Sequence, residues 1–143
     1  MYKHTHRVLI ALTLFAGLMV PATQAQSTML KANIPFDFVV GDKQFPSGEY
    51  NVKPVNQTAT LIQGKDAVSS AIVLTSAAQA KQISSVGKLV FNRYGDQYFL
   101  SKIWPAASDM GRELRKSRLE REVAQRLSNG GTTVIAAQSP VKK

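Results

Sequence analysis

Basic side chains concentrate in one short stretch near the C-terminus. Six of them lie between positions 112 and 126, and a basic helix of this kind could bind phosphate, anionic lipid or nucleic acid. Glu113, Glu120 and Glu122 are interleaved with them, which spreads the charge and favours a solvated helix with ion pairs on its surface. The candidate contacts are Arg112, Arg115, Arg118 and Arg121, with Lys116 and Arg126 completing the cluster.

A second candidate contact surface combines one arginine with aromatic side chains. Arg93 lies next to Tyr94, and Tyr98 and Trp104 follow on the next predicted strand. These residues could form a patch that is both aromatic and basic. Aromatic side chains on strands are more often part of the core, so both interpretations stay open.

Acid–base and metal chemistry is restricted by the residues that are missing. The only histidines are His4 and His6, so positions 26–143 contain neither histidine nor cysteine. This absence excludes a histidine-based triad, a Cys–His pair and an ordinary zinc site from that part of the chain. Four aspartates lie in or beside predicted turns, where aspartate commonly caps the backbone: Asp37, Asp42, Asp66 and Asp96. We therefore expect no catalytic residues, no cofactor and no metal.

The N-terminal segment has the pattern of a secretory signal peptide. Two basic residues precede a mostly apolar run at positions 8–20, and small side chains follow at Thr23 and Ala25. The run is shorter than the roughly 20 residues that a membrane-spanning helix needs. We expect residues 1–25 to be removed, so that an exported chain begins at Gln26. The expected location is periplasmic or extracellular, with no transmembrane span after cleavage.

Composition and charge divide the rest of the chain into two parts. The sequence has 143 residues, 44% of them hydrophobic, which suits one globular domain, and a net charge of +9. Positions 26–111 carry eight basic and six acidic side chains, whereas positions 112–143 carry eight and three. We expect a β domain over 26–111 and a basic amphipathic helix over 112–128. A flexible tail should follow over 129–143, in which Thr133–Ala137 is a possible edge strand.

Turn sequences recur every eight to twelve residues in the first part. This spacing predicts an antiparallel β-sandwich or a small barrel. Gly41-Asp42 and Gly95-Asp96 are each flanked by apolar segments and place glycine first, which is typical of a type II′ hairpin turn.

The turn around Pro46 leads into a strand that contains Tyr50. Pro46 and Gly48 suit the second and fourth positions of a type I turn. The Gly-x-Tyr spacing allows a tyrosine corner, in which the hydroxyl group bonds to backbone a few residues upstream. The alternative is an ordinary half-buried strand tyrosine, and either role is structural.

The Gly95-Asp96 loop sets the register of its two strands. With two residues in the loop, Arg93 faces Tyr98 and the two faces of the hairpin follow by alternation. Both faces are apolar, so one should meet the core and the other should need a cover. The first face carries Leu89, Phe91, Tyr98 and Leu100, and the second carries Val90, Tyr94, Phe99 and Ile103.

The basic helix is the expected cover for the second face. Leu119, Val123 and Leu127 repeat at a spacing of four residues and therefore share one helix face. Ser108 or Asp109 would cap this helix at its N-terminus. The apolar stripe is narrow, so we expect the helix to dock weakly.

Four segments resemble a group of uncharacterised small secreted bacterial proteins. The Pro-x-Gly-x-Tyr element also looks like a turn-to-strand element of secreted β-sandwich modules. The resemblance implies an exported β fold and implies no chemistry. The segments are Ile34–Lys43, Phe45–Tyr50, Phe91–Leu100, and Gly111–Leu114 with Lys116-Ser117-Arg118.

These observations predict an exported, non-catalytic binding or structural module of the cell envelope or extracellular space. The alternative is a peripheral protein that binds an anionic envelope polymer or lipid through its basic helix. The expected partner is a protein or an anionic envelope component. Nucleic acid is not expected, because export separates the protein from it.

Overall fold

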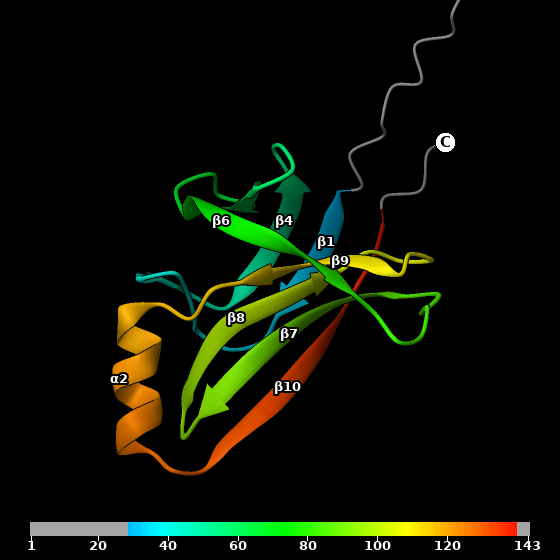
Figure 1. Cartoon of the computed structure of the whole chain (residues 1–143). Coiled ribbons are helices and arrows are strands. Elements are labelled where there is room, and N and C mark those ends of the chain that lie inside the picture. Colours follow the sequence, from blue (N-terminus) through cyan, green and yellow to red (C-terminus); the bar gives the residue numbers. More distant parts are fainter. Residues whose placement is uncertain (1–28, 140–143) are drawn as a thin grey trace, which may run out of the picture.

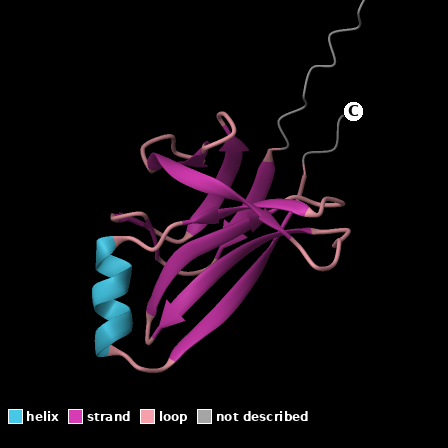
Figure 2. Cartoon of the chain, in the orientation of Figure 1, coloured by secondary structure: helices cyan, strands magenta, loops and turns pink. Residues whose placement is uncertain are grey.

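The computed structural model describes residues 29–139, so the predicted signal peptide lies outside the described residues. Figures 1 and 2 show a chain built mainly from strands, with one helix at the side of the sheet in the described part. The strands are β1 (Leu30–Ile34), β2 (Phe38–Val40), β3 (Lys43–Phe45), β4 (Gly48–Pro54), β5 (Ala59–Gly64), β6 (Ser70–Gln79), β7 (Gly87–Tyr94), β8 (Gln97–Trp104), β9 (Met110–Leu114) and β10 (Gly130–Ala137), and the helix is α2 (Arg118–Arg126).

The strands form one mixed sheet in which β6 links two halves. Its first half pairs with β5, in the order β1-β4-β5-β6, and its second half pairs with β9. Beyond β9 lie β8, β7 and β10, while β2 adds a short parallel pairing to β8. A single bridge between Lys31 and Gln138 joins β1 to the end of β10, and no continuous ladder closes the described sheet. The expectation of a mainly β, sandwich-like fold with one C-terminal helix is confirmed.

The two hairpins have the register that their loops predict. Tyr94 pairs with Gln97 and Phe91 with Leu100 across the second hairpin, and Val40 pairs with Lys43 across the first. Gly95 has a φ of +61°, a value that suits glycine at the first central position of a type II′ turn. Local turn chemistry therefore determines both pairings.

The face predicted for Ile103 is wrong, because a bulge interrupts β8. The register shifts between Val90 and Phe91, whose partners are Lys102 and Leu100, so Ser101 is the extra residue. An extra residue reverses the alternation beyond it. Ile103 therefore joins the main core beside Leu100 and does not share a face with Phe99.

The main core is formed by the inward faces of both halves of the sheet. Three phenylalanines, Phe38, Phe45 and Phe91, are completely or almost completely buried at its centre. Tyr50 packs edge-on against Phe38 and donates its hydroxyl hydrogen to the carbonyl oxygen of Pro46 at 2.6 Å. The structure thus has the tyrosine corner, and burial raises the pKa of Tyr50 above its ordinary value.

The C-terminal part differs from the expected helix over 112–128 and tail over 129–143. Residues 110–114 form β9, and α2 begins only at Arg118, with Ser117 as its N-cap and not Ser108 or Asp109. The backbone N–H and C=O groups of β9 find hydrogen-bond partners on β6 at one side and on β8 at the other. These long-range ladders override a local sequence that also suits a helix.

The segment predicted as a flexible tail is largely strand β10. All eight of its residues pair with β7, from Gly130 opposite Tyr94 to Ala137 opposite Gly87. Its central residues are β-branched, which suits a strand, and β7 offers an otherwise unpaired edge. The possible edge strand over Thr133–Ala137 is therefore present and starts three residues earlier.

Candidate binding cleft

An open cleft of about 870 Å³ lies at the end of the sheet where β4 turns into β5 and β8 turns into β9. Leu30, Val52 and Ile103 are buried side chains that form its apolar floor. Val55 and Met110 lie at its rim and are about half exposed. A concave, mainly apolar surface with a few polar groups is the usual form of a small-molecule site.

Arg112 supplies the charge of this cleft. On β9 the side chains of Met110, Arg112 and Leu114 share one face, and Leu114 is buried in the core, so Arg112 lies on the inward side. The arginine pairs with Ile103 of β8 and Ala77 of β6, and all three residues line the cleft. The candidate surface contact Arg112 is therefore part of a recessed site and not of a basic helix.

Two hydrogen bonds hold the Arg112 guanidinium group in place. Its Nη1 donates to the carbonyl oxygen of Gln57 and to Oγ1 of Thr75, both at 3.1 Å. The Thr75 hydroxyl group lies 3.1 Å from the hydroxyl group of Thr60, which is completely buried in the cleft wall. These bonds connect β9 to β6 and to the β4–β5 turn, so the group is oriented before any ligand arrives.

The β8–β9 loop closes one side of the cleft. Pro105, Ala106, Ala107 and Ser108 all line it. Ala107 has a φ of +54°, which is uncommon for a residue with a Cβ atom, and its N–H donates to the carbonyl oxygen of Ser84 at 2.7 Å. This contact with the preceding β6–β7 loop keeps the rim in a defined shape.

Trp104 packs on the opposite side of β8 from the cleft floor. Its indole ring lies directly over Gly111 and leaves no room for a Cβ atom at that position. The neighbouring Ile103 points into the core, so Trp104 faces outward by alternation. The tryptophan thus covers the back of the strand pair that carries Arg112.

The expected patch of Arg93 and Trp104 is not formed, because the two residues lie at opposite ends of the hairpin. Trp104 pairs with Lys88, whereas Arg93 pairs with Tyr98 beside the turn. Arg93 lies 5.5 Å from the centroid of the Tyr98 ring, and Tyr98 stacks on Phe36 at 3.9 Å. The basic and aromatic contact therefore exists as a small stack of Arg93, Tyr98 and Phe36.

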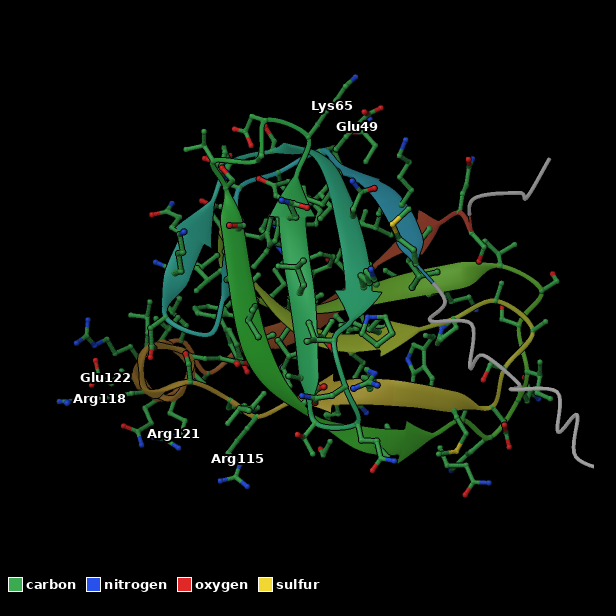
Figure 3. The ribbon with its side chains drawn as sticks, turned by 90° about the horizontal axis from the view of Figure 1, so that it is seen from above. Glu49, Lys65, Arg115, Arg118, Arg121 and Glu122 are labelled. Atoms are coloured by element: carbon green, nitrogen blue, oxygen red, sulfur yellow. The ribbon has the colours of Figure 1, made fainter. Side chains whose placement is uncertain are left out.

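The remaining candidate arginines lie on or just before α2. Figure 3 shows Arg115, Arg118 and Arg121 pointing away from the sheet, far from the Glu49–Lys65 pair. Arg118 forms an ion pair with Glu122 one turn later, at 3.0 Å. Arg115 and Arg121 are exposed, and neither is among the ion pairs of residues 29–139. This surface is basic.

The side of α2 that faces the sheet carries a polar network. Glu120 is buried and accepts hydrogen bonds from Nδ2 of Asn92 at 2.7 Å and from the Tyr94 hydroxyl group at 3.4 Å. Lys116 donates to the same tyrosine oxygen at 3.2 Å. That hydrogen bond, aided by the electrostatic effect of Tyr94, raises the pKa of Lys116 above its ordinary value. The network anchors the helix to the hairpin.

The apolar stripe predicted for the helix is wrong at two of its three positions. Val123 is buried against Tyr94 and Phe99, but Leu119 and Leu127 are 40% and 44% exposed. The helix does cover the second face of the hairpin. The side of α2 that faces the sheet differs from the predicted one. The N-cap at Ser117 and the hydrogen bonds of Glu120 fix the orientation of the helix about its axis.

Two further observations concern metal ligands and the length of the helix. Within residues 29–139, which contain no histidine or cysteine, the aspartate and glutamate side chains form no group of three that could hold a metal ion. None of the helices in this described range is both long and apolar enough to cross a membrane.

Comparison of the chain with protein-family models, curated proteins and solved structures gives no match.

The sequence alone does not reveal the cleft, because its pattern predicts that Arg112 belongs to the basic helix. The signal that could have revealed it is the alternation of Met110, Arg112 and Leu114, which places one arginine on the apolar side of a strand. If these residues are interpreted as helical, Arg112 belongs to a basic surface whose charges are dispersed around the helix.

Proposed function

We propose that this protein is an exported, non-catalytic binding module of the cell envelope or extracellular space that holds a small, largely apolar ligand in the cleft. The observation that carries the proposal is the combination of a recess of about 870 Å³ with an apolar floor and one oriented guanidinium group. This volume is within the range of about 300–1,000 Å³ that small-molecule sites have.

The non-catalytic part of the proposal is supported by side-chain chemistry. Positions 26–143 have no histidine or cysteine. Glu120, the buried carboxylate of the described chain, is engaged by Asn92 and Tyr94. The cleft therefore offers a binding surface without an obvious acid–base pair.

Export is proposed from the N-terminal pattern. Expression of the full chain followed by fractionation and N-terminal sequencing tests it, and we expect a chain that begins at Gln26 outside the cytoplasm. A chain that begins at Met1 in a membrane fraction would contradict this part of the proposal.

Binding in the cleft is tested with Nile red, a neutral apolar dye whose fluorescence rises in apolar surroundings. Val55 at the rim and Val134 on β10 are 52% and 51% exposed, which makes them a matched pair. We expect Val55→Trp to fill part of the cleft and to reduce dye binding severalfold, and Val134→Trp to leave it unchanged. Equal binding by the two variants would contradict the proposed site.

A second candidate function is supported by two exposed arginines, one just before α2 and one on it. Arg115 and Arg121 could bind an anionic envelope polymer or lipid without competing internal ion pairs. Reversing both charges to glutamate should then abolish salt-sensitive sedimentation with vesicles that contain anionic lipid. The matched control is reversal of Lys81 and Lys88, two exposed lysines outside α2. Equal loss from both pairs would indicate nonspecific attraction to net charge.

A further inference from the structure

We infer that the ligand of the cleft is an amphipathic carboxylate, whose apolar body lies on the cleft floor and whose carboxylate binds the guanidinium group of Arg112. This inference rests on the proposed binding function and specifies the class of ligand. It is carried by the charge balance of the cleft and by the hydrogen bonds of Arg112.

The charge of the cleft is uncompensated. Among the described residues that line it, Arg112 is the only one that is charged. Glu113, the next residue, forms its ion pair with Lys102 at 3.8 Å, and Arg112 is not among the ion pairs of residues 29–139. A partly buried cation beside an apolar surface favours an anionic partner, since its interaction is screened less than at an open surface.

The hydrogen bonds of Arg112 leave one edge of the guanidinium group available. Both bonds to Gln57 and Thr75 use Nη1. In the described chain, Nε and Nη2 donate to no protein acceptor. Their N–H groups are parallel, and this is the fork that binds a carboxylate through two hydrogen bonds at once.

The apolar residues that line the cleft indicate that part of the ligand is a hydrocarbon. Leu30, Val52 and Ile103 form the bottom of the cleft and are almost completely buried, so most of the hydrocarbon surface that a ligand can touch belongs to the half-exposed Val55 and Met110. A small inorganic anion would leave this surface unused, whereas a neutral hydrocarbon would leave the guanidinium fork unpaired. A single carboxylate on an aliphatic chain matches both, with one negative charge against one positive charge.

The test compares decanoate with decanol, which has the same chain length and no charge. Both are titrated below their aggregation limits, and affinity is measured by displacement of Nile red from the protein expressed as the full chain. We expect decanoate to bind about ten- to hundredfold more tightly, which is the range for hydrogen bonds to a charged group. Equal affinity would overturn the inference and leave the proposed binding function standing. Failure of both to bind, with dye binding also unaffected by Val55→Trp, would contradict the proposed function itself.

Variants of Arg112 locate the carboxylate. In Arg112→Gln the preference for decanoate should fall to about onefold while the affinity for decanol stays the same, which also shows that the cleft is still folded. The matched control is Arg115→Gln, an exposed arginine from the same basic run, which should keep the full preference. A preference that survives Arg112→Gln and falls in Arg115→Gln would overturn the inference.

Arg112→Lys gives a second measurement that does not depend on the glutamine variant folding. Lysine keeps the charge but lacks the paired N–H edge. We expect a preference for decanoate that is smaller than in the wild type and greater than onefold. A preference equal to that of the wild type would contradict two-point binding by the guanidinium fork.

Discussion

The β7–β8 hairpin separates two apolar clusters of very different size. Its inner face, with Leu89, Phe91 and Leu100, belongs to the main core that strands from both halves of the sheet build together. Its outer face contributes Tyr94 and Phe99 to a small cluster whose third buried member is Val123 of α2. One side is thus closed by many strands, and the other is closed by a single short helix.

The difference shows two ways of covering a strand face. The inner face depends on apolar area and close packing, which many residues share. The outer face has little apolar area, and hydrogen bonds to Glu120 position the helix there. Substitutions on the inner face should therefore affect the stability of the whole fold, whereas those on the outer face should depend on a few identifiable contacts.

The largest expected effect comes from the inner face. Leu89 is completely buried, and Leu89→Ala should lower the free energy of unfolding by about 2–5 kcal/mol, because it leaves a cavity in the main core. The matched control is Leu74→Ala on β6, where the leucine is 79% exposed, and we expect a change within about 0.5 kcal/mol. Urea unfolding of both variants measures the difference. Similar losses would contradict the assignment of Leu89 to the core.

The next effect concerns the polar network under α2. Glu120→Ala removes the acceptor of Asn92 and Tyr94 and should lower the free energy of unfolding by about 1–3 kcal/mol, since buried donors lose their partner. Glu122→Ala removes only an exposed ion pair and should change it by less than about 1 kcal/mol. If the two variants melt alike, the network does not anchor the helix.

A smaller effect separates the buried residue of the helix from its exposed neighbour. Val123→Ala should lower the free energy of unfolding by about 1–2 kcal/mol, from roughly 0.8 kcal/mol for each buried carbon removed. Leu119→Ala removes more carbon atoms but should have less effect, because this leucine is 40% exposed. A greater loss of stability in Leu119→Ala than in Val123→Ala would instead support the apolar stripe that the sequence predicts.

The tyrosine corner gives a modest effect with a defined pH dependence. Tyr50→Phe removes the hydrogen bond to Pro46 and should lower the free energy of unfolding by about 0.5–1.5 kcal/mol. Burial raises the pKa of Tyr50 in the folded protein, so the unfolded chain ionises first. The advantage of the wild type over the variant should be constant below pH 10, the ordinary pKa of tyrosine, and should decrease as the pH rises above it. An advantage that grows above that pH would contradict the buried neutral hydroxyl group.

The smallest effect is expected on the outward side of α2. Arg118→Ala breaks the ion pair with Glu122, which lies in solvent, and should change the free energy of unfolding by no more than about 0.5 kcal/mol. Thermal melts at low and high salt measure this change. A loss comparable to that of Val123→Ala would show that the helix depends on its surface charges.

Short-range features were predictable because neighbouring residues determine them. The registers of both hairpins follow from glycine at the first position of a two-residue loop. The spacing of Pro46, Gly48 and Tyr50 allows a tyrosine corner or an ordinary strand tyrosine, and the hydrogen bond to Pro46 decides for the corner. By contrast, no local sequence signal indicates the bulge at Ser101. Regular alternation of side chains along the strand therefore predicts the wrong face for Ile103.

The amino-acid sequence by itself determined the β class, the hairpin pairings and the lack of histidine and cysteine over positions 26–143. Only the tertiary structure decided that residues 110–114 are a strand, that β10 extends the sheet and that Arg112 lies in a cleft. The physical reason is that a strand is stabilised by hydrogen bonds to partners far away in the chain. The local sequence around Arg112 is compatible with a helix and with a strand, and its partners on β6 and β8 decide between them.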